Sequence, residues 1–123
     1  MSEKIDWNVT ARVAGGPMVA ASGSTKADAY DKIEVTIPTG ATQAVDIAPG
    51  NWTSVLFLAL NPAQPSDKLS YKANGSDIVV DGPHFLVGAG AVALLGTGAV
   101  NLSFTNGSAS DAQIDILVGR KVP

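Results

Sequence analysis

The chain contains no cysteine and only one histidine, His84. Disulfides, thiolate chemistry and cysteine-based zinc sites are therefore excluded, and one histidine per chain cannot form a histidine-rich metal site. A catalytic triad around His84 would also need an activated serine, but no G-x-S-x-G segment occurs. We therefore expect packing alone to stabilise the fold, and we predict neither an enzyme nor a bound cofactor or metal.

Charge is also scarce. Charged residues make up 15% of the chain, compared with about 25% in typical soluble domains. The net charge is −3 and the lysines and arginines are scattered, so no basic patch for nucleic acid is present. Residues 82–110 carry no charge at all. This shortage indicates either exposed sheet faces that carry hydroxyls instead of charges or an exterior that copies of the same chain partly cover. The uncharged segment is expected in the core or at a subunit contact.

Long hydrophobic runs are absent too. The most apolar stretch, "FLVGAGAVALLGTGAV" at 85–100, is shorter than the run of about 18 residues that a membrane helix needs, and it contains four glycines. The stretch contains a G-x-G sequence, but no βαβ pattern surrounds it. It therefore does not indicate nucleotide binding. Glu3, Lys4 and Asp6 lie where a secretory signal would be apolar, so we expect a cytoplasmic protein, or one in a virion, with no membrane partner.

Alternation of apolar and polar residues is the dominant pattern, and it is typical of half-buried strands. A run that is apolar at every position suits a central strand buried on both faces. The predicted strands are 5–13, 33–37, 100–105 and 114–118, with shorter ones at 42–48, 68–73 and 77–80 and an apolar one at 54–60.

Turn-forming residues separate these strands at intervals of about 8 to 12 residues, which is typical of a sandwich or barrel. Asn74-Gly75 gives the best hairpin signal, because both residues tolerate positive φ. We expect residues 84–88 and 90–95 to form a further hairpin, and a single helical turn at 25–32. The prediction is one all-β domain over residues 1–123: an antiparallel sandwich of about eight to ten strands, jelly-roll-like or immunoglobulin-like.

Several side chains could carry a site. His84 lies near Asp81, and an Asp–His pair could orient a base, although a turn histidine bonded to backbone is the simpler interpretation. Trp52 and Tyr71, with Trp7 and Tyr30, could form a platform that stacks on a sugar, and Asn51 could bind the same ligand. Five of the six asparagines lie in N-x-[ST] sequences, including Asn101 and Asn106. Such sites are modified only in secreted proteins, and in strands the same spacing forms polar rows.

The resulting hypothesis is a non-enzymatic structural protein. It would be a homo-oligomeric β module, a trimer for example, such as a decoration, cement or tail component of a virus or phage particle. The alternative is a carbohydrate- or peptide-binding module. The predicted interface residues come from the uncharged segment: Phe85, Leu86, Val87, Leu94 and Leu95.

Overall fold

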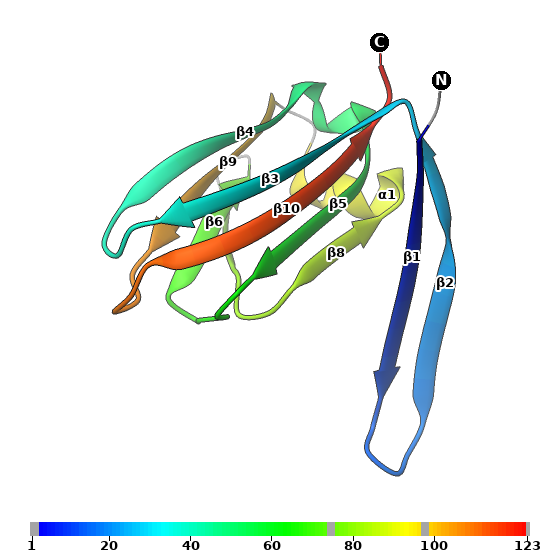
Figure 1. Cartoon of the computed structure of the whole chain (residues 1–123), viewed down its shortest axis with the longest axis horizontal. Helices are drawn as coiled ribbons and strands as arrows, with labels where there is room; N and C mark the ends of the chain where they lie inside the picture. The colour runs from blue at the N-terminus through cyan, green and yellow to red at the C-terminus, as the bar shows by residue number, and fades with distance from the viewer. Residues whose placement is uncertain (1–2, 74–75, 97–98, 123) are drawn as a thin grey trace.

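The computed structural model describes residues 3–73, 76–96 and 99–122, without the side chains of 48–51, 99 and 100. Ten strands form three antiparallel sheets (Figure 1). The strands are β1 (Glu3–Arg12), β2 (Met18–Ala27), β3 (Ala29–Ile37), β4 (Thr42–Asn51), β5 (Val55–Pro62), β6 (Leu69–Ala73), β7 (Ser76–Val79), β8 (His84–Val87), β9 (Ala99–Asn106) and β10 (Ala112–Arg120).

Eight of these strands make a two-layer sandwich. One sheet has the order β3-β10-β5-β8 and the other β4-β9-β6-β7. The chain changes sheet at every step from β3 to β10 except between β6 and β7, which pair as a hairpin across residues 74 and 75. This is the strand order of a jelly roll. The prediction of an antiparallel all-β sandwich is therefore confirmed.

The core lies between the two sheets and consists of the inward residues of each alternating strand. On β10 the inward residues Ile114, Ile116 and Val118 are fully buried, and on β9 Leu102 and Phe104 are too. β5 is buried on both faces, as its apolar run predicts. Leu58 and Leu60 face the sandwich core, whereas Phe57 and Ala59 belong to a second, smaller cluster on the outer face of the sheet.

Two predictions about the chain were wrong. Residues 90–95 are helical rather than extended: α1 (Ala89–Val92) and a 3₁₀ turn (Ala93–Leu95) follow Gly88, whose φ of +95° an L residue rarely adopts. Alanine and leucine favour helix, and the buried Val92 and Leu95 have the i, i+3 spacing of a helical face. Residues 25–32 are not helical, because β2 ends at Ala27 and β3 begins at Ala29.

The sequence also failed to indicate β2, whose residues MVAASGSTKA neither alternate nor favour strands. It pairs with β1 over the full length of both strands, from Glu3 opposite Ala27 to Arg12 opposite Met18. This hairpin, residues 3–27, is named the arm here. It forms a sheet of its own and projects away from the sandwich (Figure 1).

Candidate functional site: the arm and the cleft at its base

The arm has one apolar face and one polar face. Residues directly opposite each other in an antiparallel pair share a face. Ile5, Trp7, Val9 and Ala11 therefore share one with their partners Thr25, Gly23, Ala21 and Val19. The other face is polar near the base, where Asp6 lies opposite Ser24 and Asn8 opposite Ser22.

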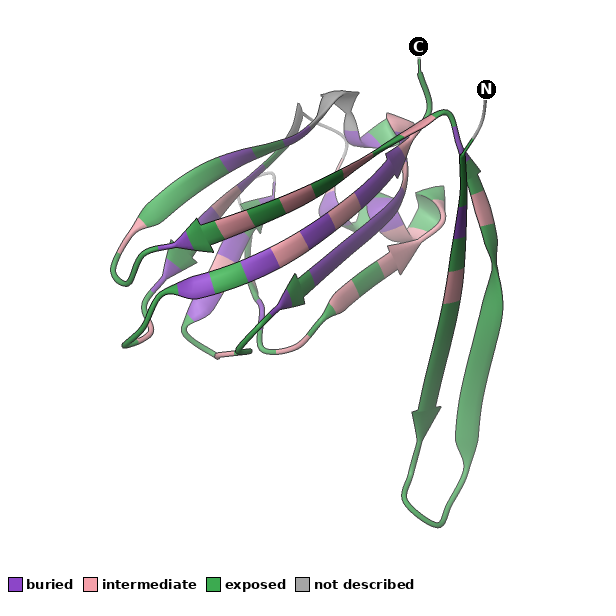
Figure 2. Ribbon diagram, in the orientation of Figure 1, coloured by how far each residue is buried: buried purple, intermediate pink, exposed green. Residues whose placement is uncertain are grey.

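Only the base of the arm packs on the sandwich. Ile5 and Ala27 are buried against Phe57 and Ala59 of β5. The close approach requires the glycine at 119, since a Cβ there would lie 2.5 Å from Cδ1 of Ile5. Beyond this point the arm diverges, and every residue from 8 to 24 is exposed (Figure 2).

Trp7 marks the place where the arm leaves the sandwich. Its indole lies against Gly23 of the paired strand, where a Cβ would be only 2.9 Å from Cζ2 of the ring. The Nε1 hydrogen of Trp7 is buried, and no hydrogen-bond partner for it occurs among the described residues. The ring therefore packs over the backbone of Gly23, which has no side chain of its own, and stabilises the pairing of β1 with β2 at this position.

A cleft of about 270 Å³ opens between the arm and the outer face of the β3-β10-β5-β8 sheet. We name it the arm cleft. One wall is the outer face of the sheet and the other is β1, and among the described lining residues only Asp6 and Asn8 are polar. The apolar lining residues are Phe57, Ala59, Phe85, Val87 and Leu117 on the sheet and Ile5, Trp7 and Val9 on the arm.

The far end of the arm, residues 12–19, is also apolar and is named the arm tip. Val13, Met18 and Val19 are 62%, 58% and 75% exposed. The turn that joins the strands is well formed, because the Val13 amide donates to the Pro17 carbonyl and the Gly16 amide to the Val13 carbonyl. The arm tip thus presents aliphatic side chains to solvent from a defined backbone.

The charges of the arm and of the rest of the chain have opposite signs. Residues 1–27 hold three basic and two acidic side chains, whereas residues 28–123 hold five basic and nine acidic ones, giving +1 and −4. Arg12 is the cation at the arm tip, and Asp6 is the charged residue that lines the arm cleft.

The predicted interface residues separate into three groups. Phe85, 51% exposed, and the half-buried Val87 lie together in the arm cleft. Leu94 is 80% exposed but is not part of the cleft lining. Leu86 packs against the sandwich core and Leu95 is buried in it, so these two do not form a surface.

The aromatic residues predicted to stack on a sugar do not form a platform. Trp52 and Tyr71 are each 1% exposed and belong to the sandwich core, where neither ring face is open to a ligand. The loop-like sequence around Trp52 is a short 3₁₀ turn (Trp52–Ser54) that points the indole inward. The side chain of Asn51 lies outside the described residues.

His84 hydrogen-bonds to Tyr71 rather than to an acid. Its Nδ1 lies 3.0 Å from the Tyr71 hydroxyl, and the two rings meet edge to face. The hydrogen bond and ring contact join β8 of one sheet to β6 of the other. The simpler interpretation of the sequence placed the His84 hydrogen bond on the backbone, whereas its partner here is a side chain. No hydrogen bond from His84 to Asp81 is found in the described part of the chain.

Burial raises the pKa of Tyr71 from 10.0 to about 12. The Tyr71 hydroxyl loses its proton at a lower pH in the unfolded state than in the folded state. The free energy of unfolding is therefore expected to fall as the pH rises from 10 to 12. Tyr71→Phe should remove this part of the decline, and at neutral pH it should cost about 1 kcal/mol for the lost hydrogen bond. Urea unfolding at several pH values measures both effects. Tyr30→Phe, at an exposed tyrosine, is the control, and an unchanged pH slope in Tyr71→Phe would contradict the assignment.

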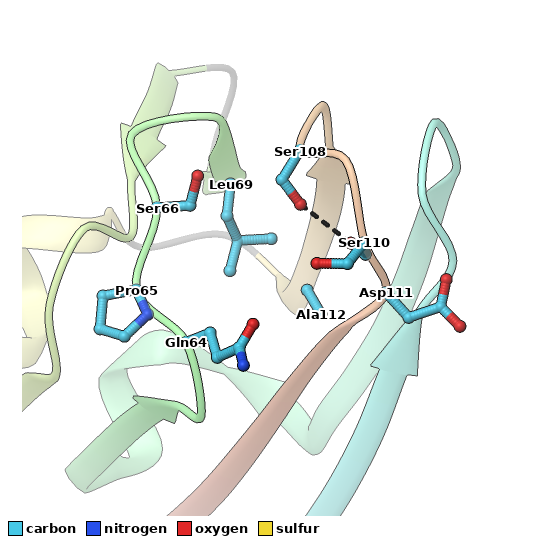
Figure 3. A pocket seen from close by; sticks show the side chains of 8 residues that line it. All are labelled: Gln64, Pro65, Ser66, Leu69, Ser108, Ser110, Asp111 and Ala112. Atoms are coloured by element: carbon cyan, nitrogen blue, oxygen red, sulfur yellow. Dashed lines mark hydrogen bonds between the residues drawn. The ribbon is translucent and has the colours of Figure 1, made fainter.

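A second, smaller cleft of about 210 Å³ lies at the end of the sandwich, between residues 64–69 and 108–112 (Figure 3). Four of its eight lining residues carry a hydroxyl or an amide, and the Ser108 hydroxyl oxygen lies 2.9 Å from the Ser110 carbonyl oxygen. The volumes of this cleft and of the arm cleft are both below the range of about 300 to 1,000 Å³ usual for small-molecule sites. The lining residues are Gln64, Pro65, Ser66, Leu69, Ser108, Ser110, Asp111 and Ala112.

Within the described ranges, no group of three or more histidine, aspartate or glutamate residues is placed to hold a metal ion. No helix in the same part of the chain is long and apolar enough to cross a membrane. Asn106, one of the N-x-[ST] asparagines, is fully buried and hydrogen-bonded to Ser108, so its sequence motif forms a turn.

The arm and the arm cleft together expose apolar side chains of both the hairpin and the sheet. Comparisons of the chain with protein-family models, with curated proteins and with solved structures find no match.

Proposed function

We propose that the chain is a non-enzymatic structural module that assembles with copies of itself, as an accessory component of a virus or phage particle does. The observation that carries this proposal is the arm. It is a projecting hairpin with an apolar face that its own chain leaves exposed from residue 8 to residue 24.

An isolated two-stranded hairpin is at best marginally stable in water. Natural sheet proteins usually protect such exposed edges and faces with charges or cover them with another element. Here the strands carry Val9, Ala11, Val19 and Ala21 instead. A second copy that covers this face would stabilise the arm and bury apolar surface at the same time.

The particle setting rests on analogy. Jelly rolls serve as viral capsid domains, and also as lectin and cupin domains, so the fold alone does not select a function. The low charge and the exposed arm favour assembly among these uses. The alternative of a carbohydrate- or peptide-binding module depended on Trp52 and Tyr71, which lie in the core, so no observation favours it as a second candidate.

The test is the solution mass by analytical ultracentrifugation over a concentration series. We expect the wild-type chain to form a closed oligomer. Val9→Asp combined with Val19→Asp should raise its dissociation constant at least about a hundredfold, because each substitution would bury an unpaired charge. Ser22→Asp, on the polar face of the same arm, should leave the mass unchanged. A wild-type protein that stays monomeric at every concentration would refute the proposal.

A further inference from the structure

We propose that the arm tip of one copy inserts into the arm cleft of another copy. This inference rests on the proposed function and names the two surfaces that meet. The first observation is that both surfaces are apolar and unpaired within one chain: the tip exposes Val13, Met18 and Val19, and the cleft exposes half of Phe85.

The polarity of the arm tip matches that of the arm cleft. The arm cleft has an apolar wall on each side, with Phe85 and Val87 on the sheet and Trp7 and Val9 on the arm. An inserted element must therefore present apolar side chains on both of its faces. The arm tip does so, because neighbouring residues of a strand point to opposite faces: Val19 lies on one face, and Met18 lies on the other beside Arg12. A volume of about 270 Å³ is enough for a few aliphatic side chains rather than for a whole domain.

The charges agree with the same contact. The arm carries +1 and the rest of the chain −4, so an arm is attracted to the sandwich of another copy. Insertion of the tip would bring Arg12 toward the cleft of its neighbour, where Asp6 is the lining acid. Asp6 now accepts a hydrogen bond from Ser24 and lies 3.7 Å from the Lys4 ammonium, in an exposed site that can take a further cation.

The symmetry of the contact also allows closed assemblies. Tip and cleft are different surfaces on the same chain, so two copies can exchange tips reciprocally, or three can form a ring in which each tip enters the next cleft. In either assembly every tip and every cleft is used. The tip is carried well away from its own sandwich (Figure 1), which leaves it free to reach another copy.

Engineered disulfides test the contact directly, since the natural chain has no cysteine. Full-length Val19→Cys and full-length Val87→Cys are mixed in equal amounts, oxidised mildly and analysed on non-reducing gels. A disulfide requires Cα atoms within about 7 Å. We expect the mixed tip-to-cleft dimer to form at least about ten times faster than in the control mixture of Val19→Cys with Val79→Cys, whose second cysteine lies on β7.

The outcomes separate this inference from the proposed function. An oligomer by ultracentrifugation without preferential Val19–Val87 cross-linking would overturn the tip-in-cleft contact and leave assembly standing. A monomer at all concentrations would overturn both. As a second measurement, Met18→Asp and Phe85→Asp should each raise the dissociation constant about tenfold or more while the circular dichroism spectrum remains that of the wild type. Unchanged assembly in both folded variants would also overturn the contact.

Discussion

Asn106→Ala is expected to lower the free energy of unfolding by about 3 kcal/mol or more. Asn106 is fully buried near the end of β9. Its amide nitrogen donates to the carbonyls of Ile37 and Ser110, each at 2.9 Å, and its side-chain oxygen accepts hydrogen bonds from the backbone amide and the hydroxyl of Ser108. Alanine would leave the buried Ile37 carbonyl without this donor and the Ser108 backbone amide without this acceptor, which is why the cost exceeds that of one ordinary hydrogen bond.

The change is measured by urea unfolding followed by tryptophan fluorescence. Asn101→Ala is the matched control, because Asn101 lies on the same strand and in the same N-x-[ST] sequence type but is exposed. It should shift stability by about 0.5 kcal/mol or less. Equal effects of the two substitutions would mean that Asn106 does not hold the 106–111 segment and the end of β3 together.

Trp52→Ala is expected to cost about 3 to 5 kcal/mol, because it would leave a large cavity in the core. Trp52 is 1% exposed, and its Nε1 hydrogen is buried with no hydrogen-bond partner among the described residues. Trp52→Phe retains most of the apolar volume and removes that unsatisfied donor. It should therefore cost less than half as much. Thermal and urea unfolding of both variants give the comparison.

The same pair of variants distinguishes a core role from a ligand-binding role. With Trp52 in the core, the main consequence of Trp52→Ala is instability, and Trp52→Phe restores most of the stability. If Trp52→Ala instead unfolded like the wild type while losing binding to a glycan in a carbohydrate panel, the core assignment of Trp52 would be contradicted.

The failed predictions share one cause. Alternation of apolar and polar residues shows only which face of its own strand a residue lies on, and not which other segment pairs with that strand. β2 has no alternation, yet it is a strand because β1 offers a complete row of partners across the Gly15-Gly16-Pro17 turn. A strand followed by such a turn was a signal that could have predicted it. Residues 90–95 were expected to be extended, although Val92 and Leu95 already had helical spacing and glycines flanked the segment on both sides.

Burial of single residues was harder to predict than strands. Trp52 follows Pro49 and Gly50 in a sequence that reads as a loop, but a 3₁₀ turn directs its ring into the core. In the sequence, Asn106 could not be distinguished from the other N-x-[ST] asparagines. The sequence does not show that the carbonyls of Ile37 and Ser110 lie beside it. Phe85 and Val87 were identified from the absence of charge, whereas the wall that faces them belongs to the arm, far away in sequence.

The sequence by itself determined that this chain is an antiparallel all-β sandwich, because period-two alternation and turn residues depend only on neighbours along the chain. The alternation also indicated which face of most sandwich strands is apolar, but not that Val9 and Val13 of the first predicted strand would be exposed. The tertiary structure alone decided the strand order, the separation of the arm from the sandwich and the cleft at its base. These features depend on which strands pair and which faces meet, and such contacts join residues whose separation in the chain carries no local signal.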